Sequence, residues 1–191
     1  MRTLFAIVLA AATPAVAAPE GWVVVRDAGF AIAFPRDWTH NERRLPNVRA
    51  FYEAPDRSPA NCNLIARPNA ALAGLKQAEL DAQIKVLPDD QWANLTGLGG
   101  RDAKLGDAKL VESRDVMLGA RPAKRAVIEV ALLTPQVTLH SRGAYVLALR
   151  PGTLWILTCG GVGKTAQDAR ASFAHWEKTF NGIADSLRIE P

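Results

Sequence analysis

The run GGVGKT at residues 160–165 has the strongest chemical pattern in the chain. Its spacing is similar to a phosphate-binding loop, in which backbone N–H groups surround phosphates, the lysine meets their charge and the hydroxyl holds magnesium. The standard loop needs a glycine five residues before Gly163, where this chain has Thr158. Such a loop also opens a domain with parallel strands still to come, and 26 residues follow Thr165 (191 minus 165). We therefore expect a strand-to-helix turn and no nucleotide cofactor.

A helix is expected after this turn. The glycines permit positive φ, Thr165 is a good N-cap, and Asp168 supplies the acidic member of a capping box. An apolar stripe then recurs at spacings of three and four: Phe173, Trp176, Phe180, Ala184 and Leu187. The pattern predicts a C-terminal amphipathic helix with one buried face. Gly182 disfavours a helix interior, so a kink or an end is expected near Asn181.

Cys62 and Cys159 are the two cysteines of the chain. In an oxidising compartment two cysteines most simply form one disulfide, and we expect the Cys62–Cys159 bridge. Two buried free thiols are the structural alternative. Cys159 at a helix start suggests an activated thiolate, and a redox pair is a further alternative without a Cys-x-x-Cys motif. No histidine or acid stands at ligand spacing from either cysteine, so no metal is expected.

The histidines, His40, His140 and His175, form no zinc-hydrolase motif. His140 precedes Ser141 in an alternating strand. A serine hydrolase needs an acid that orients the histidine and a nucleophile on a sharp turn, and Gly-x-Ser-x-Gly is absent from the sequence. A hydrolase that uses His140 therefore stays an alternative, and we assign no catalytic residue.

Four residues are candidates for partner binding. Trp92 stands in a loop-like acidic region and is interpreted as an exposed aromatic anchor, with partial burial as the alternative. Trp38 follows a proline and is expected to pack as a lid on the sheet edge. Arg43 and Arg44 form the most basic neighbourhood, between Arg36 and Arg49. This neighbourhood suits an acidic partner or lipid headgroups, with a solvated loop as the alternative.

The N-terminus has the pattern of a secretory signal peptide. Arg2 precedes a short apolar run, and Ala15-Val16-Ala17 is a small-x-small cleavage site. We expect residues 1–17 to be removed after Ala17 and residues 18–191 to form one periplasmic domain of 174 residues (191 minus 17). The apolar run is too short to cross a bilayer, and no other segment does so. The formal charge of +4 is interspersed along the chain and gives no case for nucleic acid.

The expected elements are strands joined by short turns, followed by the C-terminal helix. Strands are predicted over residues 22–26, 30–34, 48–53, 61–66, 108–118, 123–133, 137–149 and 154–158, and a helix over 75–87. In that helix Leu75, Ala78, Ala82 and Val86 are placed on one side. Short hairpin connections imply antiparallel neighbours. The fold class is α+β, an antiparallel β-sheet with helices packed on it.

The run GFAIAFPRDW at residues 29–38 looks like the opening of the PsbP/Mog1-like group, which includes DcrB-like bacterial periplasmic proteins. The strand-then-helix ending, with Phe180, Ile183, Ser186 and Leu187, is similar too. The resemblance implies an accessory or partner-binding protein without a shared catalytic site or cofactor, and it transfers no functional residue.

Our first hypothesis is therefore a non-catalytic binding protein of the periplasm or cell envelope. It would bind a protein partner or a small ligand in the groove between sheet and helices. The alternatives are an enzyme that uses Cys159 or His140, and association with a membrane surface through residues 36–49.

Overall fold

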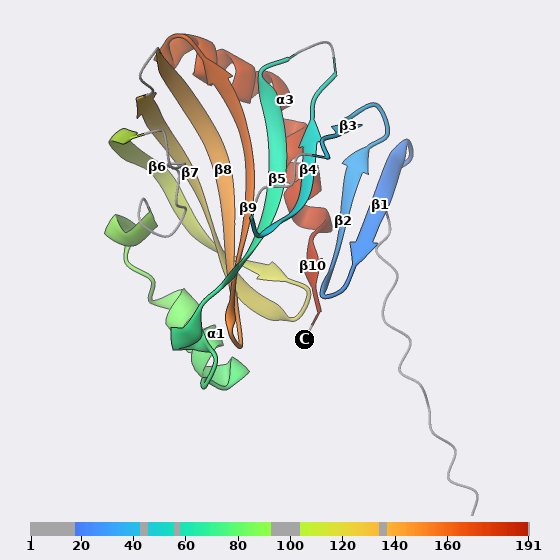
Figure 1. Ribbon diagram of the computed structural model, residues 1–191, viewed down its shortest axis with the longest axis vertical. Coiled ribbons are helices and arrows are strands. Elements are labelled where there is room, and N and C mark those ends of the chain that lie inside the picture. The colour runs from blue at the N-terminus through green and yellow to red at the C-terminus, as the bar shows by residue number, and fades with distance from the viewer. Residues whose placement is uncertain (1–17, 43–45, 56–57, 93–103, 134–136, 191) are drawn as a thin grey trace, which may run out of the picture.

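The computed structural model describes residues 18–42, 46–55, 58–92, 104–133 and 137–190 (Figure 1). The strands are β1 (Trp22–Asp27), β2 (Phe30–Pro35), β3 (Thr39–His40), β4 (Val48–Glu53), β5 (Ala60–Pro68), β6 (Lys104–Leu118), β7 (Arg121–Leu133), β8 (Thr138–Arg150), β9 (Thr153–Gly163) and β10 (Arg188–Ile189). The helices are α1 (Gln77–Lys85) and α3 (Ala166–Ser186), with 3-10 turns η1 (Ala70–Leu72) and η2 (Asp89–Gln91).

Seven strands form an antiparallel sheet in the order β3-β4-β5-β9-β8-β7-β6, and β1, β2 and β10 form a smaller sheet. The predicted meander is confirmed, because β6, β7, β8 and β9 pair in sequence order. Gly119 and Gly152 make the tight turns between these strands with φ of 63° and 72°. The α+β prediction is confirmed, with α3 after the last long strand (Figure 1).

The two faces of the seven-stranded sheet carry separate cores. Successive residues of a strand point to opposite faces, so Ala144 and Val146 of β8 face one way and Tyr145 and Leu147 the other. The first pair belongs to the core under α3 and β2, and the second pair to the core under α1. We call these the α3 face and the α1 face.

The predicted disulfide is confirmed and lies on the α3 face. Cys62 of β5 stands directly opposite Cys159 of β9, and the two residues are bonded with their Cα atoms 4.1 Å apart. Their exposed fractions are 0% and 1%. The bridge therefore joins the two halves of the sheet within the core, and neither sulfur meets solvent.

The prediction of a glycine turn before α3 is wrong. Strand β9 continues through Gly160, Gly161 and Gly163, and none of these glycines has positive φ. Gly161 and Gly163 permit the close approach of α3. A Cβ on Gly161 would lie 2.7 Å from the backbone nitrogen of Phe173, and one on Gly163 would lie 2.7 Å from that of Ala169. The bare strand lets α3 rest directly on the sheet.

The capping box of α3 is present, but the expected kink near Asn181 is absent. Thr165 Oγ1 accepts from the backbone N–H of Asp168 at 3.1 Å, and the Asp168 carboxylate accepts from the Thr165 N–H at 3.1 Å. The helix continues past Gly182 to Ser186. A Cβ at residue 182 would lie 2.9 Å from the ring of Trp22, so the glycine makes room for an aromatic side chain.

Helix α1 is shorter than the predicted range 75–87, and its buried side was placed wrongly. Leu80 and Ile84 are its buried residues, whereas the side chain of Val86 is 76% exposed. Leu80 and Ile84 are four residues apart and so lie one above the other on one face. They are the larger apolar residues of the helix, and burying them removes more apolar surface from water than burying Ala78 and Ala82.

Candidate functional site

Trp92 is not an exposed anchor, so that interpretation is corrected. Its exposed fraction is 1%, and it belongs to the α1-face core with Leu80, Ile84 and Ile128. The physical reason is that η2 turns the chain back onto the sheet, where a large aromatic side chain covers apolar strand residues. The acidic residues before it, Asp89 and Asp90, are exposed and gave the misleading polar context.

Trp38 is likewise unavailable to a partner. Its exposed fraction is 4%, and its ring makes edge contacts with Trp176 and Phe180 of α3, with centroid distances of 5.5 and 6.2 Å. It is therefore a core residue between the N-terminal strands and α3, and not a lid on the sheet edge. Arg43 and Arg44 lie outside the described residues, so their role at a partner or membrane surface stays a prediction.

The geometry disfavours both catalytic alternatives, an enzyme that uses Cys159 and an enzyme that uses His140. Cys159 is bonded to Cys62, so its sulfur is not a thiolate. His140 and Ser141 are successive residues of β8, and their side chains therefore point to opposite faces of the sheet. Within the described residues, no group of three or more histidine, cysteine or acidic side chains is placed to hold a metal. No described helix has the length and apolar character needed to span a bilayer.

Arg125 and Tyr145 are two other buried polar side chains, and both belong to the packed interior of the protein. Arg125 is 5% exposed and donates a hydrogen bond to Asn181 of α3, and burial lowers the pKa of its guanidinium. Tyr145 is 1% exposed, and burial raises the pKa of its phenol. The phenol therefore stays neutral at physiological pH, and we assign neither group to a site.

The α1 face contains a hollow that we call the apolar groove. Its volume is about 270 Å³. Its floor is made by Leu147, Leu149 and Leu154 of the sheet, and its walls by η1, the end of α1 and the segment before η2. The full lining is Asn69, Leu72, Gln83, Ile84, Val86, Leu87, Pro88, Gln91, Leu147, Leu149 and Leu154. Val86 stands at the rim with most of its side chain in solvent.

The groove exists because α1 covers only part of the sheet. The helix has nine residues and is held at one end by polar contacts. Gln77 Nε2 donates to the Leu149 carbonyl at 3.1 Å and to Asp81 at 2.7 Å. Asp81 in turn accepts from Arg121 of β7 at 3.0 Å. These contacts fix α1 over β7 and β8, and the groove lies beside the C-terminal end of the helix.

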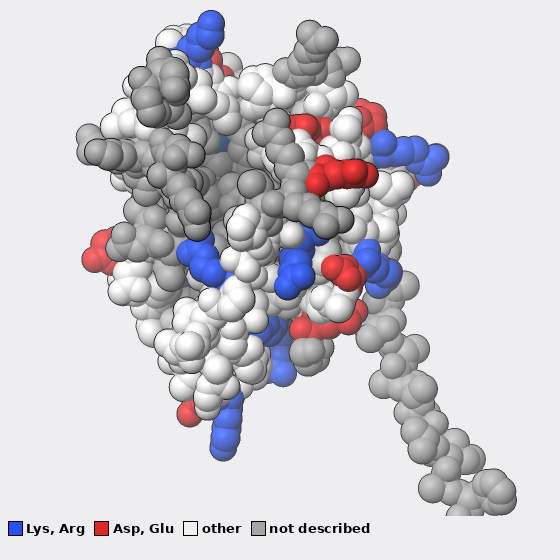
Figure 2. All heavy atoms as spheres, in the orientation of Figure 1, with Lys and Arg blue, Asp and Glu red and all other residues white. Residues whose placement is uncertain are grey.

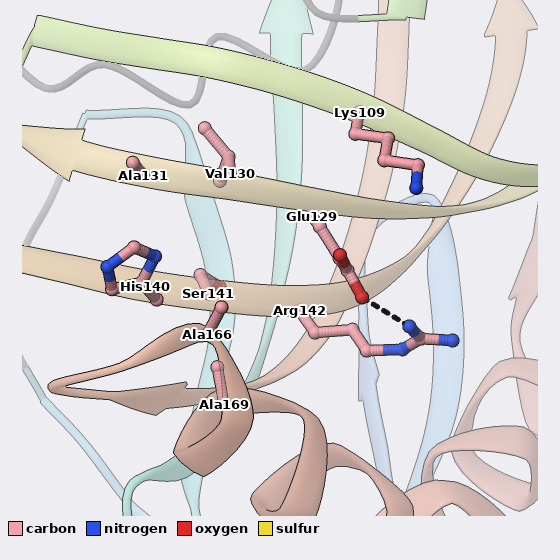
Figure 3. Close-up of a pocket in the computed structure, with 9 residues that line it drawn as sticks. All are labelled: Lys109, Glu129, Val130, Ala131, His140, Ser141, Arg142, Ala166 and Ala169. Atoms are coloured by element: carbon pink, nitrogen blue, oxygen red, sulfur yellow. Dashed lines mark hydrogen bonds and ion pairs between the residues drawn. The ribbon is translucent and has the colours of Figure 1, made fainter.

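The α3 face contains a second hollow, the polar pocket, at the N-terminal end of α3 (Figure 3). Lys109 of β6 is paired in register with Glu129 of β7, and Glu129 with Arg142 of β8. Glu129 accepts two hydrogen bonds of 2.8 Å from Nε and Nη2 of Arg170 on α3. It accepts a third from Nη1 of Arg142, whose guanidinium lies 5.3 Å from the ring centroid of Phe173.

These partners fix the charge of Glu129. The hydrogen bonds from Arg170, helped by those from Arg142, lower the pKa of the carboxyl to about 2, against the opposing effect of burial. The carboxylate is therefore ionised at every physiological pH and holds two guanidiniums side by side. Sequence reasoning missed this cluster, although a glutamate between Ile128 and Val130 in a buried strand was a signal.

Charged side chains elsewhere are scattered. On the face drawn in Figure 2, acidic and basic side chains are interspersed, without a broad area of one sign. The described surface on that side therefore gives no support to a nucleic-acid interface, whose footprint is a basic patch.

No family model matches the chain, and no curated protein is similar to it in sequence. Solved structures do match. PsbP (CyanoP) from Synechocystis sp. PCC 6803 is 11% identical, with a TM-score of 0.53 over 95% of this chain and 98% of that chain. The Ran-binding protein Mog1p from Saccharomyces cerevisiae is 10% identical, with a TM-score of 0.51 over 88% of this chain and 95% of that one.

These likenesses, together with the described topology, define an α+β protein built on one long antiparallel sheet with a C-terminal helix. The fold is that of the PsbP/Mog1-like group, as the sequence resemblance implied. At this level of identity the comparison shows the fold alone.

Proposed function

We propose that this chain is an exported, non-catalytic accessory protein whose apolar groove receives an apolar side chain of a protein partner. The observation that carries the proposal is the groove itself. It is a preformed hollow with a leucine floor and an exposed valine at its rim. Exposed apolar surface around a hollow is typical of interaction sites.

The size of the groove favours a protein partner over a free small molecule. Pockets that enclose small ligands usually measure about 300–1,000 Å³, and the groove, at about 270 Å³, is at the lower edge of that range. A hollow of this size suits one or two side chains presented by a larger surface. The fold is shared with a protein that binds a protein, since Mog1p is a Ran-binding protein. This likeness supports the class of function and not the identity of the partner.

Two observations support export to the periplasm. The buried Cys62–Cys159 disulfide is of the kind that persists in oxidising compartments. The first 17 residues have the composition of a signal peptide with cleavage after Ala17. Mass spectrometry of the protein purified from the periplasm should give an N-terminus at Ala18. Retention of residues 1–17 in a cytoplasmic fraction would contradict this part of the proposal.

The groove is tested by comparing capture on two matched variants. Val86→Asp places a charge at the rim, and Met117→Asp places the same charge at a residue of β6 that is 60% exposed and outside the groove lining. Each immobilised protein is incubated with an envelope fraction, and retained proteins are quantified by mass spectrometry. We expect a protein retained by wild type and by Met117→Asp that falls at least about tenfold with Val86→Asp, because a buried charge opposes docking. Equal retention by all three would contradict the groove as the binding site.

A further inference from the structure

The polar pocket on the α3 face lies apart from the apolar groove and has a different chemistry. We infer that it binds a carboxylate group, held between Lys109 and the guanidiniums of Arg142 and Arg170. Figure 3 shows Lys109, Glu129 and Arg142 on three neighbouring strands, at one side of the hollow that Ala166 and Ala169 of α3 complete.

The charge of the pocket selects an anion. Lys109 and Arg142 line the hollow, and Arg170 adjoins it through its hydrogen bonds to Glu129. With the one carboxylate of Glu129, these three cations leave a formal charge of +2 (3 minus 1). Both oxygens of Glu129 accept hydrogen bonds from Arg170, so this carboxylate is already occupied and is poorly placed to take a cation. Asp168 also lies at this end of α3, and its carboxylate accepts from the N–H and hydroxyl of Thr165.

Several N–H donors beside the pocket are not used within the described residues of the protein and are available to a ligand. In the part of the chain that the structure describes, the Lys109 ammonium makes no hydrogen bond or ion pair, and the side chain is exposed beside the hollow. Arg170 bonds Glu129 through Nε and Nη2, which leaves Nη1. Arg142 uses Nη1 and keeps Nε and Nη2. Because Glu129 and the Phe173 ring hold the Arg142 guanidinium, little side-chain freedom is lost when a ligand binds.

The size of the polar pocket and the orientation of α3 limit the class of ligand that the pocket can bind. The hollow measures about 200 Å³, below the range of about 300–1,000 Å³ for whole small-molecule ligands. It therefore accepts a small anionic group. Ala166, the first residue of the 21-residue helix α3, stands at the wall, where the helix dipole adds partial positive charge. Planar carboxylates match the parallel N–H groups of a guanidinium.

Titration distinguishes two sources of this carboxylate, a free small acid and an acidic peptide chain. The ¹⁵N-labelled mature chain is titrated separately with glutarate and with a tetra-aspartate peptide, and backbone and arginine Nε signals are followed by NMR. We expect saturable shifts at Lys109, Arg142, Ala166 and the Arg170 Nε group. Saturation by both probes indicates a site for free acids, and saturation by the peptide alone indicates a site for an acidic chain; each result supports the inference.

Variants make the test specific. Lys109→Ala removes the unpaired ammonium and should weaken binding about fivefold, the scale of an exposed ion pair, and Lys109→Arg should restore it. Lys178→Ala removes an exposed lysine on the outer side of α3 and should leave binding unchanged. Absence of saturable shifts with both probes up to 50-fold excess over about 1 mM protein would overturn the inference. An equal loss in Lys178→Ala and Lys109→Ala would also overturn it, because it would show general charge attraction.

This inference is independent of the proposed function. The probes act on the α3 face, whereas Val86→Asp acts on the α1 face. Failure of the titration would leave capture through the groove unaffected, and failure of the capture experiment would leave the carboxylate site unaffected.

Discussion

The two faces of the seven-stranded sheet are covered in different ways. On the α3 face a 21-residue helix lies directly on Gly161 and Gly163 of β9, and a disulfide joins two strands in the same core. On the α1 face a nine-residue helix covers β7 and β8 through Leu80 and Ile84 and leaves the apolar groove beside it. The α3 face is closed over its core and polar at its margin, whereas the α1 face has an apolar groove beside its helix, with Val86 exposed at the rim.

This difference separates the contacts that stabilise the fold, on the α3 face, from the apolar surface that is available to a protein partner, on the α1 face. Close packing tolerates neither added volume nor lost contacts, so changes on the α3 face should reduce stability. On the α1 face the rim of the groove leaves Val86 in contact with water, and burial of such apolar surface favours association with a partner.

Removal of the disulfide should have the largest effect on stability. The bridge closes a loop across a sequence separation of 97 residues, for which the chain-entropy model gives roughly 4–5 kcal/mol. We expect Cys62→Ala with Cys159→Ala to lower the free energy of unfolding in urea by about 4 kcal/mol. Because both sulfurs are buried, the native wild-type protein should also resist dithiothreitol until it unfolds. Rapid reduction of the native protein, or a loss below about 1 kcal/mol, would contradict a structural bridge.

Gly161→Ala should be the next most damaging change. Its Cβ would lie 2.6 Å from Ser172 Oγ and 2.7 Å from the Phe173 backbone nitrogen, so α3 must move away from β9. Overpacking costs about 1–3 kcal/mol of stability. Because the added Cβ would meet backbone atoms, we expect Gly161→Ala to lower the free energy of unfolding by about 3 kcal/mol, the upper end of that range. Gly74→Ala is the matched control, since no atom lies within 4 Å of its added Cβ. Equal unfolding midpoints for the two variants would show that α3 does not depend on the bare strand.

Glu129→Gln should reduce stability by about 1–2 kcal/mol at pH 7, because Arg142 and Arg170 lose their shared carboxylate; the value is modest since Arg170 is solvent-screened. The pKa of Glu129 is lowered from 4.5 to about 2 in the folded protein. Its stabilisation is therefore complete above about pH 4.5 and is lost as the pH falls through about 2. The difference in unfolding free energy between wild type and Glu129→Gln should shrink over that interval. A difference independent of pH from 6 to 2 would contradict the ion-pair assignment.

Val86→Asp should have the smallest effect on the fold. The side chain is 76% exposed, and surface substitutions usually change stability by less than about 0.5 kcal/mol. The variant should therefore melt at the wild-type temperature while losing the partner. A drop in melting temperature comparable to that of Gly161→Ala would mean that Val86 supports the fold and that loss of capture is indirect.

Local patterns predicted most of the strands. Residues 48–53 were predicted as a strand and form β4 with the same bounds. In the predicted strand over residues 123–133, alternation indicates one apolar face of Ala126, Ile128, Val130 and Leu132; the first three are buried and Leu132 is half-buried. Period-two alternation is a property of the strand alone, so it can be read without knowledge of any partner element.

The errors arose where a distant element decides the environment. Gly160, Gly161 and Gly163 fit a turn locally, but they continue β9, and Gly161 and Gly163 lie where α3 approaches the strand. Trp92 follows acidic exposed residues, and its burial depends on the apolar face of a sheet formed later in the chain. The polar pocket joins Glu129, Arg142 and Arg170 through strand register and helix position. The spacing of these residues in the sequence carries no information on the distances between their side chains in the fold.

The central claim is that the α1 face, and not the α3 face, meets the partner. The most direct measurement is photocrosslinking in the producing cells, with a photoreactive amino acid at residue 86 in one strain and at residue 178 in another. Val86 lies at the rim of the groove, and Lys178 is exposed on the outer side of α3. We expect one discrete protein adduct from residue 86 and none of that mass from residue 178. The same adduct from residue 178 alone would contradict it and place the partner on α3.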